Sequence, residues 1–66
     1  MTPEEFATIR RHLGLKQHEL AAWLDCDRGH ISRMESGAKP ITPSTALLMR
    51  AFATFGLPST WPDQAA

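Results

Sequence analysis

Hydrophobic residues recur along this 66-residue chain at the three- and four-residue spacing of amphipathic helices, with short polar segments between the repeats. A first helix is predicted to begin at Thr2-Pro3, where Thr2 and Glu5 can form a capping box, and to end at Gly14. A last helix is predicted to begin at Thr42-Pro43 and to end at Gly56. These patterns predict an all-α fold.

Two short helices joined by a tight turn are predicted between Gln17 and Gly37. Each carries one apolar stripe at helical spacing: Leu20, Ala21 and Leu24 in the first, Ile31 and Met34 in the second. Asp27 is a suitable N-cap for the second helix, which then begins at Arg28. Two helices in this arrangement form a helix-turn-helix.

The polar positions of this unit are candidate DNA contacts. The second helix exposes groups able to reach base edges and phosphates: Arg28, Gly29, Ser32 and Arg33, with His30 beside them. Before the first helix, Lys16 stands where Ser, Thr or Asn is the usual cap. The uncapped N–H groups there can bind either a phosphate oxygen or water, and the residues leave both alternatives open.

Length and composition indicate one small domain with a marginal core, for which dimerisation is a reasonable expectation. No apolar run approaches the roughly 20 residues of a membrane span, and the N-terminus lacks the order of a signal peptide, so we expect a cytoplasmic protein with no membrane partner. The formal net charge is zero, but six of the seven Lys and Arg residues lie between positions 10 and 39. This predicts a weakly basic face, although ordinary solvated charges explain the same distribution.

An enzyme or a metal protein is not expected. Cys26 and His30 are the only nearby nucleophile and base, and Cys26 falls in the turn rather than on a helix with His30. A single cysteine forms no internal disulfide, and the histidines at positions 12, 18 and 30 have no metal-ligand spacing. We therefore predict no catalytic site, no cofactor, no metal and no small-molecule ligand.

The last predicted helix has more apolar surface than one core requires, which favours a partner on its outer side. We predict a domain over residues 1–58 followed by a C-terminal tail over residues 59–66. The predicted dimer interface consists of Met49, Phe52, Phe55, Leu57 and Trp61, with folding of Leu57 and Trp61 back onto the domain as the alternative for these two. A partner protein could use the same surface, so a protein-interaction module remains an alternative.

Residues 13–37, LGLKQHELAAWLDCDRGHISRMESG, resemble the DNA-binding core of the Cro and phage-repressor type of helix-turn-helix protein, the xenobiotic-response-element family. That family's motif runs roughly LGLSQxELAxxLGVSxxxISRWExG. The resemblance implies a compact bundle of four or five helices, a lambda-repressor-like domain that binds an inverted-repeat operator in double-stranded DNA as a homodimer. Three positions depart from the motif: Lys16 replaces the small cap, Asp25 the turn glycine, and Met34 the tryptophan.

Carried over residue by residue, the resemblance implies base contacts from Arg28, Gly29, Ser32 and Arg33. It implies phosphate contacts from Lys16, Gln17, His18, His30, Ser36 and Lys39. It also implies a structural ion pair between Arg10 and Glu35. The implied function is transcriptional regulation, most often repression, such as autorepression in a phage or mobile-element operon, for example an anti-CRISPR operon. The alternative is an antitoxin-like module that neutralises a partner protein and binds DNA secondarily.

Overall fold

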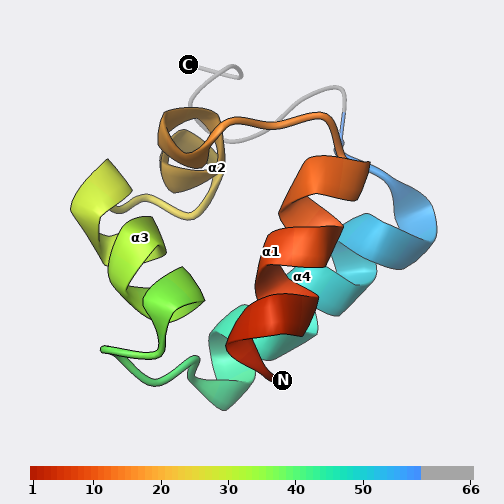
Figure 1. Cartoon of the computed structure of the whole chain (residues 1–66). Helices are drawn as coiled ribbons and strands as arrows, with labels where there is room; N and C mark the ends of the chain where they lie inside the picture. Colours follow the sequence, from red (N-terminus) through yellow and green to blue (C-terminus); the bar gives the residue numbers. More distant parts are fainter. Residues whose placement is uncertain (59–66) are drawn as a thin grey trace.

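Four α-helices form a small bundle in the computed structural model of the protein, which describes residues 1–58 (Figure 1). The helices are α1 (Pro3–His12), α2 (Gln17–Trp23), α3 (Arg28–Ser36) and α4 (Pro43–Phe55). Helix α1 packs against both α3 and α4, and α2 packs against α3. The predicted all-α fold with a helix-turn-helix in α2 and α3 is confirmed.

The starts of α1, α3 and α4 are held by the predicted caps. The Thr2 hydroxyl accepts from the Glu5 N–H at 3.0 Å, and the Glu5 carboxylate accepts from the Thr2 N–H at 2.9 Å. At the start of α3 the Asp27 Oδ1 accepts from the His30 N–H at 2.7 Å. Thr42 caps α4 in the same way, with proline at the first helical position. Local side-chain chemistry therefore sets where the helices begin.

The turn between α2 and α3 is short and closed by backbone hydrogen bonds. The Cys26 N–H donates to the Ala21 carbonyl at 2.9 Å, so the chain folds back directly after α2. Asp25 lies in the left-handed region with φ of 55°, the conformation that the family motif assigns to glycine at this position. Aspartate adopts it more readily than most side chains do. The turn therefore keeps its geometry despite the substitution.

The core lies where the inner faces of the four helices meet. Its most deeply buried side chains are Phe6, Leu20, Ile31, Met34 and Met49. Each of the four helices contributes at least one of them. Trp23 is half-buried and packs its ring edge against Phe52, with centroids 6.0 Å apart. This contact joins the end of α2 to α4.

The predicted dimer interface is wrong at Met49 and Phe52. Both are core residues of this chain, 0% and 3% exposed, because α4 turns that face inward against the other helices. Leu57 is half-buried and packs on the same core. Phe55 is exposed, and Trp61, like the rest of the predicted tail, lies outside the described residues.

The positive φ of Asp25 leads to a test of the turn. We expect Asp25→Ala to lower the free energy of unfolding by about 1 kcal/mol, because alanine adopts the left-handed conformation at a cost that aspartate and glycine largely avoid. Asp25→Gly should be at least as stable as the natural chain. Urea denaturation followed by circular dichroism measures both. Equal stability of the two variants would contradict the role given to this backbone conformation.

Candidate nucleic-acid interface

The solvent-facing side of α3 carries the residues predicted to contact bases. Residues four apart on a helix lie in one row, so Arg28 and Ser32 form one row and Gly29 and Arg33 form the next. Three of these residues are exposed, and Gly29 is half-buried. The opposite side of the helix is held in the core by Ile31 and Met34. The packing of α3 therefore presents both arginines from one face.

The guanidinium groups of Arg28 and Arg33 are available to a ligand. Within residues 1–58, neither group forms a hydrogen bond or an ion pair. Each guanidinium can donate two parallel N–H bonds to the O6 and N7 atoms of a guanine. The neighbouring Ser32 hydroxyl can donate or accept. This set of groups suits the edges of base pairs in a major groove.

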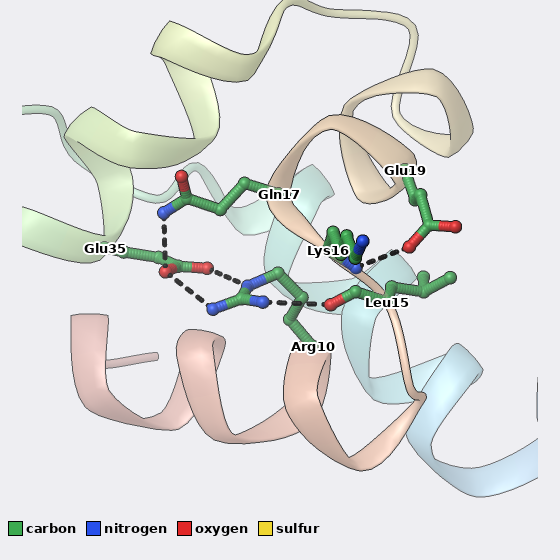
Figure 2. A network of polar contacts seen from close by, with 6 residues as sticks. All are labelled: Arg10, Leu15, Lys16, Gln17, Glu19 and Glu35. Carbon is green, nitrogen blue, oxygen red and sulfur yellow. Dashed lines mark hydrogen bonds and ion pairs between the residues drawn. The ribbon is translucent and has the colours of Figure 1, made fainter.

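A largely buried ion pair fixes the position of α3 relative to α1 and α2 (Figure 2). The Arg10 Nε donates to the Glu35 Oε2 at 2.6 Å, and the Arg10 Nη2 donates to the Glu35 Oε1 at 3.2 Å. The Arg10 Nη1 also donates to the Leu15 carbonyl at 2.9 Å, and the Gln17 amide donates to the Glu35 Oε1 at 3.1 Å. The predicted pair of Arg10 and Glu35 is confirmed as a structural contact.

The start of α2 differs in detail from the expectation. Lys16 supplies no side-chain cap, as predicted, but the Glu19 carboxylate accepts from the Lys16 N–H at 2.7 Å. Sequence reasoning missed this contact, although an acidic residue three positions after a cap is its usual signature. The side chains of Lys16 and His18 are exposed. Gln17 holds Glu35 with one amide N–H and keeps a second donor.

The end of α3 uses polar groups that were predicted to meet phosphate. The Ser36 hydroxyl donates to the Arg33 carbonyl at 3.1 Å and accepts from the Ala38 N–H at 3.4 Å. The Lys39 N–H donates to the same carbonyl at 3.1 Å. Ser36 can therefore donate to a phosphate only if its hydroxyl first breaks the hydrogen bond to the Arg33 carbonyl. The exposed Lys39 side chain needs no such change.

Cys26 and His30 are both half-buried. Burial, together with the carboxylates of Asp27 and Asp25, raises the pKa of the Cys26 thiol. A raised pKa lowers the thiolate fraction, which is the opposite of what a nucleophilic cysteine needs. No group of three potential metal ligands comes together within the described residues. None of the helices described is long and apolar enough to cross a membrane.

A protein-family model described as a helix-turn-helix domain matches residues 4–59, which include α2, α3 and α4 and nearly all of α1. No curated protein and no solved structure shows a significant match to the chain.

The position of the ion pair predicts its contribution to stability. The side chains of Arg10 and Glu35 are only 13% and 11% exposed. We expect Glu35→Ala to lower the free energy of unfolding by about 3 kcal/mol, because Arg10 would stay largely buried without its partner charge. The control is Arg11→Ala, an exposed neighbour that should change stability by less than about 0.5 kcal/mol. Urea denaturation that gives both variants the same loss would show that the pair does not stabilise the bundle.

Proposed function

The chain belongs to the helix-turn-helix domain family, of the Cro and xenobiotic-response-element type, and on that premise we propose that it is a sequence-specific regulator of transcription. Helix α3 would enter the major groove of an inverted-repeat operator, one copy of the helix from each subunit of a homodimer. The observation that supports this most directly is the exposed row of Arg28 and Ser32 beside Arg33, on the side of α3 opposite the core.

The proposed mode of reading follows from dimensions and donor geometry. The major groove is about 12 Å wide and accepts one α-helix with its side chains. Arg28 and Arg33 would each read a guanine, and Ser32 would contact a neighbouring base. Gly29 would lie against the groove with them. The operator half-site is therefore expected to contain guanine.

Phosphate contacts would orient α3 in the groove. Lys16 and His18 are exposed at the start of α2, and Lys39 is exposed after the end of α3. Their side chains would contact phosphates. Gln17 would add its second amide N–H, and His30 and Ser36 would contact phosphate at the edges. Because the net charge of the chain is zero, electrostatic attraction alone supplies little affinity. Binding would depend on the fit to bases more than on charge.

The proposed homodimer would use the outer side of α4. Leu47 and Phe55 are the large hydrophobic residues that the described chain leaves exposed, 70% and 85% respectively. Burying them in a second copy would remove apolar surface from water and add to a small core. The dimer would place two copies of α3 roughly 34 Å apart, one turn of the duplex.

The proposed regulatory effect is repression. A dimer bound across a promoter occupies DNA that the transcription machinery needs, so binding alone is sufficient. Family resemblance favours autorepression of an operon in a phage or another mobile element, including anti-CRISPR operons. An antitoxin-like role would use the exposed side of α4 for a partner protein, and the oligomeric state of the purified chain separates the two.

Selection from a library of duplexes with randomised half-sites tests DNA reading. We expect an inverted repeat containing guanine to be enriched. Arg28→Ala and Arg33→Ala should each weaken binding to the enriched duplex by about 10- to 100-fold, because each removes a bidentate contact. The control is Arg11→Ala, which removes an exposed arginine on α1 and should leave binding as in the natural chain.

Two results would count against this reading. If no duplex is enriched even at low salt, the DNA-binding function is wrong. If Arg33→Ala loses the same affinity on every single-base variant of the operator, Arg33 contacts phosphate and not a base.

Sedimentation tests the dimer. Phe55→Ser and Leu47→Ser should each weaken self-association by at least about tenfold, because serine removes most of the buried apolar area of the side chain. Ala53→Ser, an exposed change on the same helix, should leave it unaltered. A natural chain that is monomeric alone and associates only with a neighbouring gene product would favour the antitoxin-like module. A dimer insensitive to both variants would place the interface elsewhere.

A further inference from the structure

Gly29 is the one glycine inside a described helix, in the middle of the surface proposed to face DNA. The other three glycines, at positions 14, 37 and 56, have positive φ values that favour glycine. Gly29 has ordinary helical backbone geometry, so the conformation of α3 does not require it. Alanine at this position would favour the helix more. The absence of a side chain therefore needs another explanation.

The space beside Gly29 is occupied by Arg33. A methyl group at Gly29 would lie 3.1 Å from the Arg33 Nη1 and 3.8 Å from the Arg33 Cζ. Helical side chains point back toward the N-terminus, so the arginine four residues later lies over the preceding turn. The guanidinium therefore rests where the side chain of residue 29 would begin.

Asp27 borders the same space and restricts which group can move. The methyl group would also lie 3.3 Å from the Asp27 Oδ1. This oxygen is held as the N-cap by the His30 N–H at 2.7 Å. The Arg33 guanidinium has no hydrogen bond or ion pair within the part of the chain that the structure describes. Added bulk at position 29 would therefore displace the guanidinium before it displaces the cap.

We propose that Gly29 is a positioning residue for Arg33. Because residue 29 has no side chain, the Arg33 guanidinium has room to lie beside it. From there Arg33 reads a base from the N-terminal half of α3. This inference rests on the proposed DNA-binding function and assigns a cause to its specificity. Gly29 then acts through Arg33 and not through a close approach of its own backbone to DNA. A methyl group at Gly29 would alter base reading while leaving the helix intact.

A double-mutant cycle on the duplex enriched by the natural chain tests the coupling. We expect Gly29→Ala to weaken binding by roughly tenfold, and to reduce the preference for guanine at the base pair read by Arg33. In the Arg33→Ala background the same change should alter binding by less than about twofold, because the group that it displaces is gone. The control is Thr8→Ala, a comparable gain in helix propensity at an exposed position of α1, away from the proposed DNA and dimer surfaces.

Displacement of Arg33 can also be observed without DNA. In the free protein, Gly29→Ala should shift the NMR resonance of the Arg33 Nε–Hε group, and Thr8→Ala should leave it in place. Urea denaturation checks that Gly29→Ala is folded. If strain at the cap unfolds it, the comparison is made in an Asp27→Ser background, where a shorter cap no longer borders the methyl group.

The outcomes distinguish this inference from the function on which it rests. Equal losses from Gly29→Ala with and without Arg33 would mean that the methyl group meets DNA itself, which overturns the inference and leaves DNA binding intact. No loss in either background, or an unshifted Arg33 resonance, also overturns it. Failure of the natural chain to enrich any duplex would remove the proposed function and this inference together.

Discussion

The ion pair between Arg10 and Glu35 is the contact on which the arrangement of the helices depends. The core of this bundle is small, and apolar packing alone is not directional. The pair adds direction, because the flat guanidinium holds both carboxylate oxygens and the Leu15 carbonyl at once. With Gln17 on the same carboxylate, one side chain of α3 is tied to α1 and to α2 (Figure 2). Helix α3 is therefore fixed by contacts within the protein itself.

Local chemistry explains why the helices could be located from sequence. A cap acts over three residues, so Thr2, Asp27 and Thr42 could be recognised without knowledge of the fold. The same is true of Gly37, whose left-handed conformation ends α3. The pair of Arg10 and Glu35 is different, because its members lie 25 residues apart. The pair was predicted from the family resemblance, because sequence spacing alone does not indicate it.

The side of α4 that faces the core could not be derived in the same way. That helix has apolar residues around most of its circumference, and periodicity then gives no single inward direction. Contacts with α1 and with Trp23 turn Met49 and Phe52 inward and leave Leu47 and Phe55 outside. Tertiary packing therefore determines which face of α4 is buried. The closeness of Arg33 to Gly29 could not be derived from sequence either, because it depends on how the arginine side chain lies along the folded helix.

The Asp27 cap would have a kinetic consequence for the proposed binding to DNA. Its carboxylate stabilises the positive end of the α3 dipole, which removes part of the attraction that a bare helix start would exert on any phosphate. A duplex of unrelated sequence would then be held weakly. Repulsion between its phosphates and the Asp27 carboxylate opposes the attraction of the nearby arginines, whatever the base sequence. Only a site whose bases accept hydrogen bonds from those arginines would offset this repulsion. A regulator built in this way would leave wrong sites quickly and remain at the right one.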